Sequence, residues 1–209
     1  METPMKKGLL VVVSGPAGSG KGTVNHILMN RPGYAFSVSA TTRAPRPGEV
    51  DGVNYHYISV EEFKNRIQNG DLLEYTEYCG NFYGTLKKET EAVLESGKNL
   101  ILEIEVEGAM NIKRLCPDSA VLIMLLPPSY AVQEQRLRGR ATETEEVIRR
   151  RLERTKEEME YLPEYDYVVY NYDGCAEECA QEIEGIVRAE KNAMRRNPQA
   201  KSKFFGIAQ

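Results

Sequence analysis

A glycine-rich segment behind a short apolar run is the feature that most constrains this 209-residue chain. The run Leu9 to Val13 is continuous and rich in β-branched residues, which is typical of a central strand covered on both faces. The next segment has two glycines bracketing four residues with a lysine directly after, and a helical pattern follows. Such a turn directs backbone N–H groups and a helix N-terminus at phosphate oxygens. The residues expected to form this phosphate cradle are Gly15, Pro16, Ala17, Gly18, Ser19, Gly20, Lys21, Gly22 and Thr23.

The position after the lysine departs from the phosphate-loop pattern. The pattern has serine or threonine there to bind magnesium, whereas this chain has Gly22. The hydroxyl of Thr23 stands next to it and is the candidate replacement. The competing interpretation is a glycine-rich turn with an incidental lysine, but the strand before it and the helical pattern after it favour the phosphate loop.

Composition excludes several classes of protein. Hydrophobic residues make up 41% and charged residues 28%, as in ordinary globular proteins, and the length suits one domain or one domain with an inserted lobe. A net charge of -4 argues against nucleic-acid binding through the overall field of the protein. The first seven residues lack the apolar region of a signal peptide, and the run behind them is too short to span a bilayer. We therefore expect a cytoplasmic protein without a nucleic-acid or membrane partner.

A proline-rich loop from Ser39 to Glu49 carries hydroxyl groups and two arginines. Arg43 and Arg46 lie three positions apart, and guanidinium groups pair bidentately with phosphate oxygens. The loop therefore favours recognition of a phosphate monoester, although a solvated basic loop is the alternative.

Short predicted elements follow this loop. The sequence predicts strands at 53–58 and 72–78, a helix at 60–69 and a turn at 80–85. Because these elements stand between two helical units, they indicate a small lobe inserted above the phosphate loop. A short strand at 34–38 comes before the lobe, and a helix at 87–95 comes after it.

Carboxylates gather at the end of a second buried strand, predicted at 100–108. Glu103, Glu105 and Glu107 occupy this stretch. Ligands of open α/β sheets collect at the carboxyl ends of the strands, so these side chains and the phosphate loop should face one crevice. Acidic groups beside phosphates are expected to bind magnesium or a nucleotide base. The remaining predicted elements of the sheet layer are a helix at 109–115, strands at 120–126 and 167–170, and a helix at 176–192.

Arginines are concentrated between the last two predicted strands. Two helices joined by a short polar turn are expected there, forming a mobile arm. Arg136 and Arg140 lie on one helical face, where like charges repel unless an anion is bound. For Arg138, Arg149 and Arg154 we expect a solvated surface role. The basic tail at 191–203 is expected to be frayed, with its charge serving only solvation.

Taken in order, these motifs resemble those of guanylate kinases over about residues 7–187. The segments that carry the resemblance are Ser39 to Glu49, Asp51-Gly52, Tyr55, Glu74, Gly80 to Thr85 and Gly139 to Glu143. The resemblance implies an α/β phosphate-loop fold of three layers with a central parallel sheet, an inserted small β/α lobe for GMP and a helical lid. The implied divisions are a domain at 7–188 with core segments 7–36, 87–134 and 154–190, a GMP-binding lobe at 37–86, a lid at 135–153, and a tail at 191–209.

The resemblance also implies an activity, the ATP- and Mg²⁺-dependent phosphorylation of GMP, and of dGMP, in purine nucleotide metabolism by a monomer or weak homo-oligomer. The implied catalytic residues are Lys21, Arg136, Arg140 and Arg151. The implied ATP site consists of Gly15 to Thr23 with Asn171 near adenine. The implied GMP site consists of Ser39, Arg43, Arg46, Tyr55, Glu74, Tyr83, Thr85 and Glu105, with Thr23 and Glu103 as metal candidates.

The assignment of Glu74 has a chemical basis. Guanine presents N1–H and an amine side by side, so one carboxylate can accept both, whereas adenine presents an acceptor at N1. A polar site left unpaired in this way discriminates by roughly 10⁴ to 10⁵. The chain departs from the family by having Glu103 and Glu105 where aspartates are usual and Glu107 where glutamine is common, which extends each of the first two carboxylates by a methylene.

Two other interpretations remain open from the sequence. Guanylate-kinase-like domains of membrane scaffold proteins bind phosphorylated partners without catalysis, but they tend to lose the ATP machinery, and Lys21, Arg136, Arg140 and Arg151 are all present here. A related kinase of a phosphorylated sugar would have no use for the base-reading set Ser39, Glu74 and Thr85.

Overall fold

The computed structural model describes residues 7–78, 80–139 and 144–206. Its centre is a five-stranded sheet in the order β2-β7-β1-β8-β9, in which each neighbouring pair is parallel. The predicted α/β fold with a central parallel sheet is confirmed. The strands are β1 (Leu10–Ser14), β2 (Tyr34–Phe36), β7 (Asn99–Leu102), β8 (Ala120–Leu126) and β9 (Tyr167–Tyr170).

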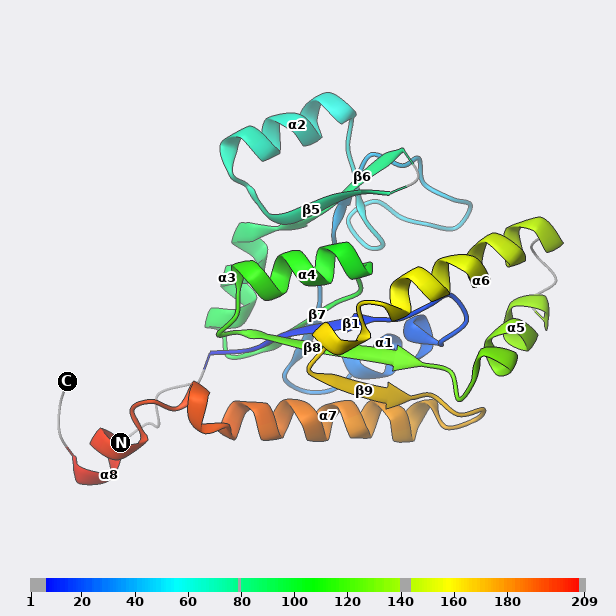
Figure 1. Cartoon of the computed structure of the whole chain (residues 1–209). Helices are drawn as coiled ribbons and strands as arrows, with labels where there is room; N and C mark the ends of the chain where they lie inside the picture. The colour runs from blue at the N-terminus through cyan, green and yellow to red at the C-terminus, as the bar shows by residue number, and fades with distance from the viewer. Residues whose placement is uncertain (1–6, 79, 140–143, 207–209) are drawn as a thin grey trace.

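Helices cover both faces of this sheet (Figure 1). Successive residues of a strand point to opposite faces, so Val11 and Val13 of β1 enter one core cluster while Leu10 and Val12 enter another. The first cluster is closed by α1 and α7, and the second by α3 and α4. The helices are α1 (Lys21–Met29), α3 (Lys87–Glu95), α4 (Val106–Leu115) and α7 (Ala176–Asn192).

A second sheet of four strands, ordered β4-β3-β6-β5, lies above the first together with α2 (Figure 1). Its elements are β3 (Ala40–Thr41), β4 (His56–Tyr57), α2 (Val60–Asn69), β5 (Leu72–Tyr78) and β6 (Asn81–Leu86). The prediction of a turn at 80–85 is wrong, because residues 81–86 form strand β6, which pairs antiparallel with β5. Gly84 permits this close pairing, since a Cβ would lie 3.0 Å from Phe63 and 3.1 Å from the Glu74 carbonyl. The strand predicted at 53–58 is confined to β4 and a bridge from Asp51 to Tyr55.

The strand predicted at 100–108 is also shorter than expected. Strand β7 ends at Leu102, and α4 already begins at Val106. The alternation of carboxylates and apolar residues at 103–107 suggests a strand. The structure instead buries residues at helical spacing, Val106, Ala109 and Ile112, and their burial favours a helix from Val106 onward. Consequently the carboxylates at 103 and 105 lie in the connection between β7 and α4.

Two helices, α5 (Tyr130–Gly139) and α6 (Glu145–Met159), form an arm beside the sheet (Figure 1). Leu137, Ile148 and Leu152 make a small apolar cluster between them, against which Ala17 packs. The two predicted helices are present, and the polar segment predicted to join them lies mostly outside the described residues. Among the residues described, no helix is long and apolar enough to cross a membrane.

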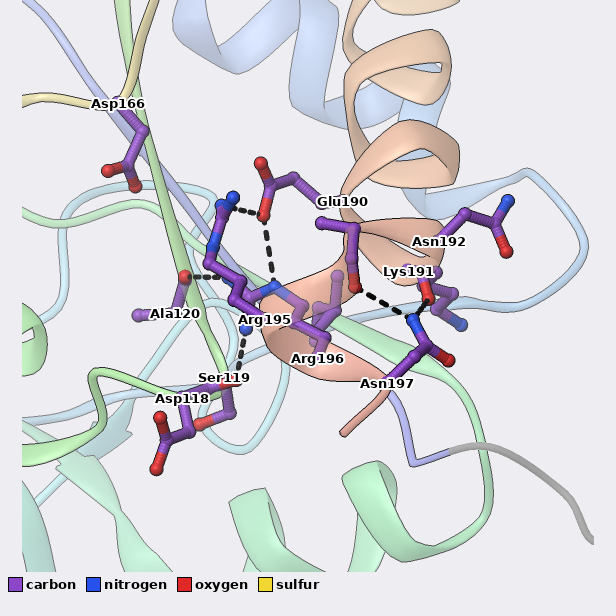
Figure 2. A network of polar contacts seen from close by, with 12 residues as sticks. Asp118, Ser119, Ala120, Asp166, Glu190, Lys191, Asn192, Arg195, Arg196 and Asn197 are labelled. Carbon is purple, nitrogen blue, oxygen red and sulfur yellow. Dashed lines mark hydrogen bonds and ion pairs between the residues drawn. The ribbon is translucent and has the colours of Figure 1, made fainter. Parts of the chain in front are cut away.

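The C-terminal tail differs from the frayed segment that was expected (Figure 2). Glu190 is 2% exposed, and its carboxylate receives hydrogen bonds from Tyr167, Arg195 and Arg196. Arg196 also donates to the carbonyl oxygen of Ala120 at 2.6 Å. The arginine charge therefore neutralises a buried carboxylate and does not serve solvation alone. Two short helices, η2 (Met194–Arg196) and α8 (Ala200–Phe205), complete the tail, and η1 (Leu162–Glu164) precedes β9.

Candidate active site

A cleft of about 1150 Å³ lies between the phosphate loop, the small lobe and α6. This volume lies just above the usual range for a pocket that holds one small ligand. Arg136 and Asn171 line a smaller, neighbouring hollow, Ser19 and Thr85 are buried, and Arg140 lies outside the described residues. The predicted site residues that line the main cleft are Gly15, Pro16, Ala17, Gly18, Gly20, Lys21, Gly22, Thr23, Ser39, Arg43, Arg46, Tyr55, Glu74, Tyr83, Glu103, Glu105 and Arg151.

The carbonyl groups of the phosphate loop are held by surrounding donors. The Lys21 ammonium group donates to the carbonyls of Gly15 and Pro16. The amide of Gln133 on α5 donates to the Ala17 carbonyl at 2.9 Å. These donors hold the loop carbonyls in place, and a loop of this kind presents backbone N–H groups as an anion-binding concavity.

The second half of the loop is anchored in the same way. The Arg136 guanidinium donates to the Gly18 carbonyl at 3.2 Å, and the Asn171 amide donates to the Ser19 carbonyl at 2.9 Å. A Cβ at Gly20 would lie 2.2 Å from the Asn171 amide nitrogen, and Gly20 has φ of 92°. The loop therefore requires glycine here for both space and backbone conformation.

The smaller hollow, about 340 Å³, lies behind the phosphate loop. Arg136 is paired there with Asp173, with its nitrogen 2.6 Å from the carboxylate oxygen, and donates to the Asn171 carbonyl at 2.8 Å. The structure therefore places Arg136 away from the main cleft, at the side of the loop that Tyr172 and Gly174 also line.

The wall opposite the loop contains a buried carboxylate. Glu74 on β5 is 5% exposed, and its Oε1 accepts a hydrogen bond from the Thr85 hydroxyl at 2.7 Å. Burial raises the pKa of Glu74, while the hydrogen bonds from Thr85 oppose that rise. A Cβ at Gly108 would lie 3.1 Å from Glu74 Oε2, so a glycine in α4, which the sequence analysis did not single out, makes room for this carboxylate.

An ion pair organises the arginine loop of the lobe. The guanidinium of Arg43 makes two parallel hydrogen bonds with the Glu49 carboxylate, both at 3.0 Å. Glu49 also accepts from the Arg46 backbone N–H and from the Tyr57 hydroxyl. The hydrogen bonds from Arg43 lower the pKa of Glu49 to about 2. Glu49, which the sequence analysis did not single out, thus fixes the loop that presents both arginines.

Two aromatic rings complete this part of the cleft. The rings of Tyr55 and Tyr83 meet edge to face at 6.0 Å between centroids, and Arg43 lies 5.5 Å from the Tyr55 ring. Burial raises the pKa of Tyr55 to about 12, so its hydroxyl remains a hydrogen-bond donor at neutral pH.

The candidate metal residues have a chemistry suited to magnesium. The Asn25 amide donates to Glu103 Oε2 at 2.8 Å, which fixes the orientation of that carboxylate at the cleft. The described residues contain no group of three or more His, Cys, Asp or Glu that could hold a metal by themselves. Mg²⁺ is commonly held by one or two carboxylates together with substrate phosphates, so Glu103 and Thr23 fit an ion that binds with ATP.

Helix α6 contributes more to the cleft than the sequence analysis expected. Arg149 and Arg154 line it, although both were predicted to be solvated surface residues. Arg154 lies 4.3 Å above the Tyr78 ring of β5 and hydrogen-bonds Glu158 at 3.2 Å. Its guanidinium is also 4.0 Å from the Glu105 carboxylate. Arg154 thus connects the arm to both the lobe and the core, a contact that helical spacing alone does not reveal.

Comparison with known proteins identifies the family. The guanylate kinase family model matches residues 7–190. The chain belongs to the guanylate kinase family. It is 48% identical over 193 residues to the guanylate kinase of Clostridioides difficile, a match that covers 92% of this chain and 93% of the relative. It is 50% identical to that of Halalkalibacterium halodurans, covering 88% and 90%. The crystal structure of guanylate kinase from Anaplasma phagocytophilum superposes with a TM-score of 0.77 at 31% identity, covering 98% of each chain.

Proposed function

We propose that the cleft transfers the γ-phosphoryl group of ATP to GMP, giving ADP and GDP, with dGMP as an alternative acceptor. The chain is a nucleoside-monophosphate kinase of the guanylate kinase family. The observation that carries the choice of acceptor is the buried Glu74 carboxylate, which lines the same cleft as the phosphate loop. An ionised carboxylate there accepts from N1–H and the exocyclic amine of guanine together.

The phosphate loop and Lys21 are proposed to bind the β- and γ-phosphates of ATP, with Asn171 and the smaller hollow near adenine. Arg136 acts from behind the loop through its bond to the Gly18 carbonyl. Arg151 is proposed to reach the transferring phosphoryl group from α6, and Arg140, which lies outside the described residues, keeps its predicted catalytic role. An arginine acting on that charge is worth about 10³ to 10⁵ in rate.

The acceptor is proposed to bind in the lobe. Arg43, Arg46, Tyr55 and Tyr83 hold the GMP phosphate, which places its oxygen in line with the γ-phosphorus. Ser39, Glu74, Thr85 and Glu105 surround the base. Because phosphoryl transfer needs little covalent chemistry from the protein, alignment of the two substrates and neutralisation of charge account for catalysis.

Mg²⁺ bound to the ATP phosphates would neutralise their charge, and Glu103 and Thr23 are the residues of this chain that would hold it.

The division into core, GMP-binding lobe at 37–86 and lid at 135–153 remains a prediction. A cytoplasmic location, the absence of a nucleic-acid partner and a monomeric or weakly associated state also remain predictions. The binding-module and sugar-phosphate alternatives are not favoured by the family match.

The test is ADP release from ATP and Mg²⁺ by the purified protein with GMP, AMP, UMP, CMP or a phosphorylated sugar as the acceptor. We expect release with GMP alone. Release with a phosphorylated sugar and not with GMP would overturn the assignment, and so would GMP binding without any ADP release.

A further inference from the structure

A buried polar connection joins the phosphate loop to the arm. Gln133 on α5 is 1% exposed and Thr155 on α6 is 5% exposed. The single amide nitrogen of Gln133 donates both to the Ala17 carbonyl at 2.9 Å and to the Thr155 hydroxyl at 2.7 Å. Thr155 in turn donates to the Arg151 carbonyl at 3.0 Å. The chain of hydrogen bonds therefore runs from the phosphate loop to the helical turn that carries Arg151.

The surroundings of this connection are apolar. Leu137, Ile148 and Leu152 form the cluster between the two helices, and Ala17 packs on it. An apolar pair could fill such a site without the desolvation cost of an amide and a hydroxyl. The polar pair restricts the position of α6 relative to the phosphate loop, because both N–H groups of the Gln133 amide are engaged. A shift of α6 along the loop would break a buried hydrogen bond.

We propose that Gln133 and Thr155 are positioning residues that fix the height of Arg151 on α6 relative to the phosphate loop. The proposal rests on the proposed function, in which Arg151 acts on the transferring group. Neither residue lines the main cleft, so both act through other residues. A displacement of about an ångström between reacting groups can cost about 10² in rate, so loss of the connection should appear in kcat.

The experiment compares Gln133→Leu, Thr155→Val and Thr155→Ser with a matched control. Thr90→Val is that control, because Thr90 in α3 is also buried at 2% exposure and also donates to the carbonyl four residues earlier, that of Leu86. Rates are measured with saturating ATP and varied GMP, below the unfolding transition of every variant as established by circular dichroism.

We expect kcat to fall about 10-fold to 100-fold in Gln133→Leu and Thr155→Val, with the KM for GMP changed less than about twofold. Thr155→Ser keeps the hydroxyl and should restore kcat to within about threefold of the parent. The double variant Gln133→Leu/Thr155→Val should lose no more than the worse single variant, because both changes break one connection. Equal kcat values for Thr155→Val and Thr90→Val, or a rescue of kcat in the double variant, would overturn the proposal.

Amide hydrogen exchange gives a readout that does not depend on turnover. The proposal expects faster exchange in both the phosphate loop and the turn from Arg151 to Thr155 in the Thr155→Val variant, and in neither segment of Thr90→Val. A parent protein inactive on GMP would contradict the proposed function, whereas faster exchange in α6 alone would contradict the connection.

Discussion

The two walls of the cleft are built in different ways. The phosphate loop is a backbone wall, whose carbonyls of Ala17, Gly18 and Ser19 are held by donors from α5 and from the residue after β9. The lobe is a side-chain wall, in which Arg43 is paired with Glu49 and Glu74 is bonded to Thr85. The first wall is therefore sensitive to added atoms, whereas the second is sensitive to charge and protonation.

The largest effect is expected for Lys21, whose side chain extends from the backbone wall. Lys21→Ala leaves the loop carbonyls of Gly15 and Pro16 without their donor and removes the cation at the phosphates. We expect kcat to fall by about 10² to 10³ with a retained fold, measured by steady-state turnover and circular dichroism. Lys113→Ala, which removes a half-buried lysine paired with Glu164 outside the cleft, is the matched control. Near-normal turnover of Lys21→Ala would refute its role.

Next in size is Glu74→Gln in the side-chain wall. The amide can accept only one of the two guanine N–H groups, so the KM for GMP should rise about 10² while that for ATP changes less than about twofold. Equal changes for both substrates would contradict base recognition by Glu74.

Glu74 also predicts a pH dependence of GMP binding. Because burial raises the pKa of Glu74, GMP affinity should increase as pH rises through a value above the usual glutamate range. That acidic limb should vanish in Glu74→Gln, while the titration of the GMP phosphate remains.

A smaller effect is expected when the arginine loop loses its carboxylate. Glu49→Gln should raise the KM for GMP about fivefold, equivalent to roughly 1 kcal/mol, because Arg43 loses its bidentate partner. Since the folded pKa of Glu49 is about 2, below its ordinary 4.5, the pair stabilises the protein above pH 4.5. The stability difference between parent and variant should shrink as pH falls from 4.5 toward 2, as measured by urea unfolding.

A matched control for that experiment is Glu62→Gln, which removes an exposed ion pair with Arg66 on α2. Its effect on the KM for GMP should be negligible. If the two variants changed that KM equally, GMP binding would not depend on the half-buried pair of Arg43 and Glu49.

The smallest effect concerns Gly22, the second residue of α1. A Cβ there would meet no atom within 4 Å, so the backbone wall has room at this position. Gly22→Ala should raise the free energy of unfolding by about 0.5 kcal/mol, because glycine is a poor helix former. Gly22→Ser adds a hydroxyl beside Lys21 and should lower the Mg²⁺ concentration needed for half the maximal rate relative to Gly22→Ala. Identical Mg²⁺ requirements would mean that the hydroxyl does not reach the ion.

Local sequence signals predicted much of the fold. The helix predicted at 60–69 has these bounds in the structure, where Ser59 caps its start and Gly70 ends it in the left-handed conformation. Strand β6 was missed because Gly80 before it and Asn81 and Gly84 within it favour a turn locally, whereas the observed strand depends on pairing with β5. Local patterns do not report such pairing.

The candidate site shows the same limit. The phosphate loop and Glu74 were identifiable because motif spacing and family resemblance apply to them. Arg154 was not identifiable as a cleft residue, because its partner Tyr78 is on another element. Helical spacing places Arg154 on a polar face of α6 but does not tell which element packs against that face. Glu49 was inside a recognised loop, but its pairing with Arg43 emerges only from the folded geometry.

The docked tail sets the length of a stable fragment. The family match ends at residue 190, yet the cations that neutralise the Glu190 carboxylate come from Arg195 and Arg196. A chain cut directly after Glu190 would retain every matched residue but lose both arginine partners of this carboxylate, leaving it the hydrogen bond from the Tyr167 hydroxyl. Cleavage after Asn197 would spare these contacts, so the boundary for a shortened, crystallisable form lies beyond the family's own limit.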